Sequence, residues 1–179
     1  GKKDEVLDPW TPVKADKNKT EIWARKYTYN QDLTINELYT KNKQILSRSM
    51  NLGYKEGGKD YKFKPESMEQ KVSAAKTNDF RRNIGSLGAF ECEVKATTGY
   101  DGFVRWDLRL RPKGPVTVNN LFLEIPIKKE HAQWISSPAR RPGEFQAHLT
   151  KKLSGRFPED PGFGKGGHTW TIGLHDTHR

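Results

Sequence analysis

The residues best suited to bind a metal ion lie near the end of the chain. His168, His175 and His178 stand close together, with Asp176 between the last two. Two imidazoles at such a spacing can face one ion when a single element holds both. A metal site also needs fixed ligands and a second shell that orients them. A terminal polar segment is more typical of exposed surface, so we expect no metal and no other cofactor.

Two aspartates and one cysteine are the candidates for acid–base or nucleophilic catalysis. Glycoside hydrolysis uses two carboxylates about 5 to 10 Å apart, and Asp101 and Asp107 are the pair closest to that pattern. Asp107 alternates with Arg105 and Arg109, which favours surface ion pairs. The single cysteine, Cys92, sits at an inward position of an alternating stretch without a persuasive base, as a buried thiol would. The sequence therefore predicts no catalytic residue and no enzyme activity for this chain alone.

Aromatic side chains near arginines indicate possible contact with a sugar. Trp134 lies in polar surroundings and precedes Arg140 and Arg141. An indole can stack on the apolar face of a pyranose, and guanidinium groups can donate to hydroxyls or to a uronate. These three residues are the predicted carbohydrate-binding site. Trp10, between two prolines, is a second candidate. Alternatively, both tryptophans could cover the edge of a β-sandwich. Trp134 could also be buried where another domain docks.

Charge and composition narrow the choice of partners. The 179 residues include 32 lysines and arginines against 22 acidic residues, giving a net charge of +10, and 33% are hydrophobic. This excess is spread along the chain without a basic tail, so nucleic acid is not the expected partner. One cysteine excludes an internal disulfide. No run approaches the roughly 20 apolar residues of a membrane helix, so no membrane span is expected.

Residues 100–127 carry the clearest structural pattern. From Val104 to Arg111 apolar and charged residues alternate strictly, as in a strand with one buried face. A turn rich in proline and glycine follows over residues 111–115. A second alternating run then covers residues 121–127. The pattern predicts a β-hairpin that carries the core, with the leucines and isoleucines of the second run facing inward.

Short strands and frequent turns fill the rest of the chain. A Gly-Gly pair predicts a hairpin turn, and alternation predicts strands over residues 21–29, 90–96 and 169–174. Two segments remain ambiguous between strand and short helix: residues 66–82, and residues 32–52, where we prefer two strands joined at 41–43. The predicted fold is all-β, an antiparallel β-sandwich of about seven to ten short strands. Residues 1–20 would form an arm, and 21–179 a single sandwich domain.

Several of these motifs together resemble a known family. They occur in one order along the chain: PWTPV at residues 9–13, WARKY at 23–27, YDGFVRWDL at 100–108 and LFLEIPI at 121–127. In this order they resemble the N-terminal β-sandwich region of a bacterial glycoside-hydrolase-like family of unknown function, related to glycoside hydrolase family 123. The closing WTIGLHDTHR resembles the family's segment leading toward a (β/α)8 barrel but departs from its Gly-Asp-Glu-x-Arg-Gly pattern at His175 and Thr177. The resemblance implies that the barrel supplies the catalytic carboxylates.

The predicted function follows from this resemblance. We expect a non-catalytic accessory domain of a secreted or periplasmic carbohydrate-active protein, which packs on, or presents glycan to, a hydrolase domain beyond residue 179. Two alternatives remain open. The net charge of +10 allows a basic nucleic-acid or polyanion-binding β module, and the chain could also be a free-standing glycan hydrolase.

Overall fold

A computed structural model describes residues 5–131, 134–138, 145–149 and 173–175. The chain divides into two compact units, residues 1–126 and 127–179. This division reflects the contacts within each unit and does not test the predicted domain boundaries. The arm over residues 1–20 and the single domain over 21–179 therefore stay predictions. In the part of the chain that the structure describes, no helix has the length and apolar content to cross a membrane.

The first unit begins with a five-stranded antiparallel meander whose strands follow one another in sequence order. Its strands are β1 (Lys14–Ala15), β2 (Lys19–Ile22), β3 (Arg25–Tyr29), β4 (Ile35–Thr40) and β5 (Lys43–Gln44). The single strand predicted over residues 21–29 is wrong, because Ala24 at φ 57° turns the chain between β2 and β3. Left-handed residues Lys41 and Asn42 form the turn predicted at 41–43. The second strand of the predicted pair is the short β5, so the alternation expected up to residue 52 is interrupted until the next strand starts at Asn51.

The second sheet is built from four longer antiparallel strands in the order β11-β10-β9-β8. They are β8 (Phe63–Val72), β9 (Asn78–Leu87), β10 (Phe90–Gly99) and β11 (Val104–Pro112). The alternation predicted for β10 and β11 is confirmed: Phe90, Cys92, Val94 and Ala96 are buried, and the arginines of β11 are exposed. The ambiguous segment over residues 66–82 is strand at both ends, with a turn between β8 and β9.

A third sheet corrects the predicted central hairpin. It contains β12 (Asn120–Glu124), β6 (Asn51–Glu56) and β7 (Lys59–Tyr61), in that order. Strand β12 pairs with β6, whereas β11 pairs with β10 in a different sheet. The predicted pairing of these two runs is therefore wrong. The turn predicted at Gly57-Gly58 joins β6 to β7, and both glycines have positive φ as a tight hairpin turn requires.

The face of β12 is also opposite to the predicted one. Its leucines are exposed, while the Phe122 ring covers Gly53 of β6. A Cβ at Gly53 would lie 2.1 Å from the Phe122 ring, so only glycine admits the ring there. With Phe122 packed on β6, the alternate side chains Leu121 and Leu123 of β12 point away from the core.

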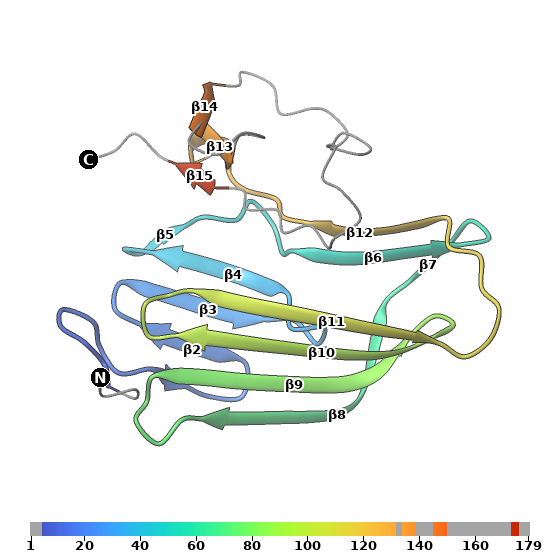
Figure 1. Ribbon diagram of the computed structural model, residues 1–179, viewed down its shortest axis with the longest axis horizontal. Helices are drawn as coiled ribbons and strands as arrows, with labels where there is room; N and C mark the ends of the chain where they lie inside the picture. Colours follow the sequence, from blue (N-terminus) through green and yellow to red (C-terminus); the bar gives the residue numbers. More distant parts are fainter. Residues whose placement is uncertain (1–4, 132–133, 139–144, 150–172, 176–179) are drawn as a thin grey trace. The chain divides into compact units, whose positions relative to one another are not determined.

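The sheets of the first unit enclose one core, so the predicted all-β antiparallel sandwich is confirmed. Figure 1 shows β2, β3 and β4 lying behind the four-stranded sheet. Tyr54 of β6 is fully buried and packs edge-on against Phe90 of β10 at 5.2 Å between ring centroids. The described residues of this unit hold twelve strands, more than the seven to ten expected.

A buried arginine joins the first two sheets. Arg81 of β9 is 3% exposed, and its Nε donates to Asp79 at 2.8 Å. Its NH1 and NH2 donate to three backbone carbonyls in and beside the first hairpin, those of Lys17, Asp16 and Lys19, at 2.7 to 3.0 Å. The guanidinium also lies over the Tyr29 ring, 4.5 Å from its centroid. Charge pairing and carbonyl acceptors together satisfy a cation that burial would otherwise destabilise.

The second unit contains a short 3-10 helix, η1 (Lys129–His131), and a three-stranded antiparallel sheet. Its central strand β13 (Trp134–Pro138) pairs with β14 (Phe145–Leu149) and β15 (Gly173–His175). Of the strand predicted over residues 169–174, the structure describes only 173 and 174, which lie in β15.

The buried arginine allows a test of the register of β9. We expect Arg81→Ala to lower the free energy of unfolding by about 3 to 5 kcal/mol, because it leaves the Asp79 carboxylate buried without its cation. Urea denaturation measures this loss. Arg82→Ala is the matched control: the next residue points outward, and its removal should cost far less. Equal losses at the two positions would mean that β9 is shifted by one residue.

Candidate functional site

The residues predicted to bind carbohydrate are only partly described. Trp134 begins β13, where its backbone pairs with Leu149 and His175. Arg140 and Arg141 lie outside the described residues. The predicted contact of these three residues with a glycan therefore stays a prediction.

The other chemical candidates from the sequence fall into separate places. His168, Asp176 and His178 lie outside the described residues, and among the described ones no three metal-ligating side chains gather. Asp107 accepts from Arg105 Nε and NH2 at 3.0 Å, so the predicted surface ion pair is confirmed. Asp101 instead accepts the backbone N–H of Phe103 at 2.9 Å and stabilises the turn before β11.

Cys92 is a buried thiol, as predicted. Its side chain is 1% exposed on the inner face of β10. Burial raises the pKa of this thiol to about 11, with a smaller contribution from the Asp32 carboxylate. A thiol in this state is a poor nucleophile at neutral pH.

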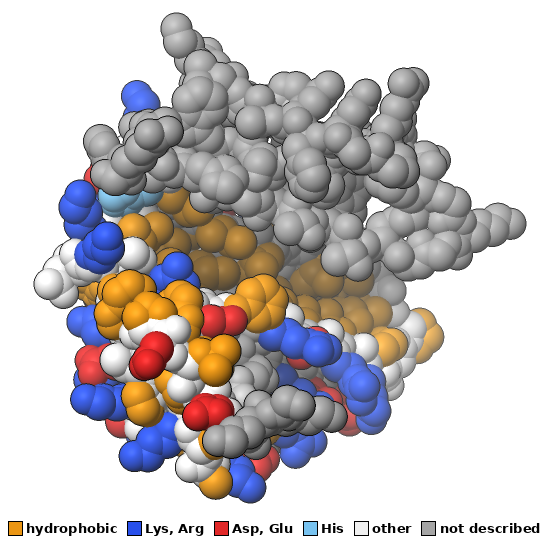
Figure 2. Space-filling model, turned by 60° about the vertical axis from the view of Figure 1, so that its left-hand side comes forward, with side chains coloured by type: hydrophobic (Ala, Val, Ile, Leu, Met, Phe, Trp, Pro, Cys, Tyr) orange, Lys and Arg blue, Asp and Glu red, His pale blue; other side chains and the backbone are white. Residues whose placement is uncertain are grey.

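The second predicted aromatic, Trp10, is half-buried against another tryptophan. Its ring packs edge-on with Trp23 at 5.5 Å between centroids, and Trp23 is 46% exposed. Trp23 lies in the β2–β3 turn, which Arg25 and Tyr27 join to the β10–β11 turn. Figure 2 brings this end of the sandwich forward and shows hydrophobic side chains among charged ones. The exposed indole is therefore Trp23, which the sequence pattern had placed within a continuous strand.

A strongly charged concave surface lies on the outer face of the four-stranded sheet. It is an open groove of about 380 Å³, and four cations from three adjacent strands line it together with two carboxylates and Ile84. We call it the arginine groove, after its cations Arg82, Lys95, Arg109 and Arg111. Each of these lies on a strand position that alternates with the core, so backbone geometry brings them to one face.

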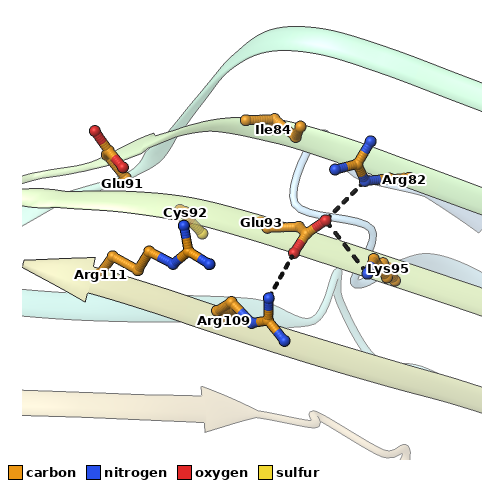
Figure 3. A pocket seen from close by; sticks show the side chains of 8 residues that line it. All are labelled: Arg82, Ile84, Glu91, Cys92, Glu93, Lys95, Arg109 and Arg111. Atoms are coloured by element: carbon orange, nitrogen blue, oxygen red, sulfur yellow. Dashed lines mark hydrogen bonds and ion pairs between the residues drawn. The ribbon is translucent and has the colours of Figure 1, made fainter.

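One carboxylate holds three of these cations in place. Glu93 Oε1 accepts from Arg82 Nε at 2.7 Å and lies 3.3 Å from Lys95 Nζ. Its Oε2 lies 3.8 Å from Arg109 NH1. Figure 3 shows the three cations directed at this carboxylate from three strands. The bond from Arg82 lowers the pKa of the Glu93 carboxyl, so Glu93 stays ionised in the neutral range.

The groove retains unused donors. Arg111 has no hydrogen-bond or ion-pair partner among the described residues. Within the described ranges Arg109 has only the long contact to Glu93, and it is 62% exposed. Arg82 uses Nε for Glu93, and its two terminal nitrogens point away from this carboxylate. The arrangement can therefore accept an anionic group from outside.

Sequence reasoning placed the arginines of β11 outward but did not assign them a site. Glu91, Glu93 and Lys95 alternate in the same way on β10, and that second stripe was the missed signal. The two stripes come together because β10 and β11 pair with Glu93 opposite Arg109.

A second surface is apolar and lies on β12 and on the residues just before and after it. The exposed side chains are Val118, Leu121, Leu123 and Ile125, between 41% and 53% exposed. We call these four residues the β12 face. Leu121, Leu123 and Ile125 alternate as in a strand with one buried face, yet in the described residues they face away from the core.

The state of Cys92 leads to a labelling prediction. We expect thiol reagents to modify folded protein very slowly at pH 8, because the thiol is both buried and protonated. The pKa rises from the usual 9 to about 11 on folding. The contribution of this proton to the free energy of unfolding is therefore complete below pH 9 and decreases as the pH rises toward 11. Rapid labelling of the native protein at pH 8, with unfolding suppressed, would contradict the assignment.

Comparison with known proteins agrees with the resemblance seen in the sequence motifs. The family model described as glycoside hydrolase 123, third domain, matches residues 21–158, which is more than half of the chain. No curated protein and no solved structure matches the chain significantly. The matched residues include all four strands of the arginine groove's sheet and the exposed strand β12. The chain therefore belongs to the glycoside hydrolase 123 family, as an example of its third domain.

Proposed function

We propose that this chain is a non-catalytic domain that docks on the catalytic domain of its parent glycoside hydrolase through the β12 face. The parent enzyme is secreted or periplasmic, and its catalytic carboxylates come from the other domain. Family membership supports the presence of an adjoining hydrolase domain. The observation that carries the docking role is the exposed apolar alternation of β12.

The β12 face has the character of an interface between domains. Single exposed apolar residues are normal, but four within eight positions of one segment form a continuous patch. The patch is bordered by charge, because Arg48 forms an ion pair with Glu124 at the end of β12. An apolar centre with a polar border is the usual composition of a docking surface.

This domain would also present glycan to the catalytic domain of the parent enzyme. Trp134, Arg140 and Arg141 remain the residues proposed for this contact, since an indole stacks on a pyranose and guanidinium groups bind its polar substituents. Titration of the full chain with neutral oligosaccharides, with and without Trp134→Ala, measures it. We expect the substitution to weaken binding at least tenfold. A wild-type chain that binds no sugar would remove glycan presentation and leave docking in place.

The docking role predicts a separation between stability and association. Leu123→Lys should leave the free energy of unfolding of this chain within about 0.5 kcal/mol, because the side chain is already exposed. The same change should weaken association with the separately produced catalytic domain at least tenfold, because it places a charge within an apolar contact. Isothermal titration calorimetry measures the association, and urea denaturation measures the stability.

Met68→Lys is the matched control. Met68 is 59% exposed on β8, in the sheet that does not contain β12, so the same substitution introduces the same charge elsewhere. Its association constant should equal that of the wild type. Equal weakening by both variants, or a wild-type chain that does not associate with the catalytic domain, would refute docking through β12.

A further inference from the structure

The arginine groove holds like charges in unfavourable positions. In the β9–β10 register Arg82 lies directly opposite Lys95, where facing side chains have Cβ atoms about 5 Å apart. Like charges at this distance destabilise a sheet. Glu93 contacts both and offsets part of the repulsion, but it is one carboxylate among three cations. The sheet therefore maintains excess positive charge on this face.

The position of Glu93 turns this excess charge toward solvent. Its side chain is 17% exposed, which is less than any of the three cations that it contacts. It lies at the centre of the groove. From there it contacts Arg82 on one side through Nε and Arg109 on the other through NH1, as Figure 3 shows. Arg111 lies two residues along β11, roughly 7 Å further on, and its guanidinium has no partner in the described part of the chain. Guanidinium groups with free donors are suited to carboxylate or sulfate oxygens.

We propose that the arginine groove binds the carboxylate or sulfate groups of an acidic glycan. The assignment of a glycan as carrier rests on the proposed function, since this domain belongs to a glycoside hydrolase family. The anionic group lies between Arg109 and Arg111, and Ile84 offers an apolar contact to the sugar ring. The residues that line this site are different from those of the predicted Trp134 contact and from those of the β12 face.

The composition of the groove favours a glycan over a nucleic acid. Proteins that bind single strands without sequence preference stack bases on aromatic side chains beside a basic track. No aromatic residue lines the arginine groove, and two of its charged residues are glutamates, which repel a continuous phosphate backbone. A glycan with separated anionic groups can place them at the arginines and its neutral parts near Glu91 and Glu93.

Titration of the full chain with four probes tests the proposal. The probes are chondroitin sulfate, polygalacturonate, uncharged dextran and an oligothymidylate, each followed by calorimetry at fixed salt. We expect binding to at least one of the two acidic glycans, stronger than binding to dextran or to oligothymidylate. The sulfated and the uronic probe distinguish the two sources of negative charge.

The double variant Arg109→Gln with Arg111→Gln should weaken binding of the acidic glycan at least tenfold. Lys55→Gln with Lys59→Gln is the matched control, since it removes the same charge from the β6–β7 hairpin; its affinity should stay within twofold of the wild type. Urea midpoints show that both variants are folded. Equal weakening by both pairs, tighter binding of oligothymidylate, or no acidic-glycan binding by the wild type would each overturn the proposal. Association with the catalytic domain, measured on the same variants, reports separately on docking.

Discussion

The sandwich depends on a single guanidinium placed where a hydrophobic side chain would be expected. Arg81 offers five N–H donors in a plane, and carboxylate, hydroxyl and carbonyl oxygens from two sheets meet them. Carbonyl acceptors of this kind come from backbone beside β1 and β2, so the short first hairpin is held by hydrogen bonds as much as by apolar packing. Since directional bonds demand one geometry, the cation fixes how the two sheets face each other.

The burial of Arg81 has consequences for both faces of β9. Its buried face carries Asp79, Arg81 and Asn83, while Phe80 and Ile84 lie on the outer face. The outer face of the sheet consequently combines apolar and charged side chains, and it is there that the arginine groove forms. The polar interior of one strand and the charged exterior of its sheet are therefore two aspects of the same register.

Sequence patterns predicted those parts of the fold that depend on neighbours in the chain. The alternation of β10 and β11 and the Gly57-Gly58 turn were predictable because each is decided within a few residues. The partner of β12 was not, because alternation shows which residues share a face and not which strand lies beside it. The burial of the polar side chains Asp79, Arg81 and Asn83 on β9 was not predictable from alternation either. The arginine groove combines both difficulties, since Glu93 meets its cations only through the register of three strands.

The buried state of Cys92 bears on where such a domain can work. Exposed thiols in an oxidising compartment form mixed disulfides, join two chains or proceed to sulfenic acid. A protonated sulfur enclosed by β-sheet side chains offers neither the thiolate nor the access that these reactions need. A domain whose thiol is enclosed in this way can therefore enter oxidising surroundings without requiring a partner for it.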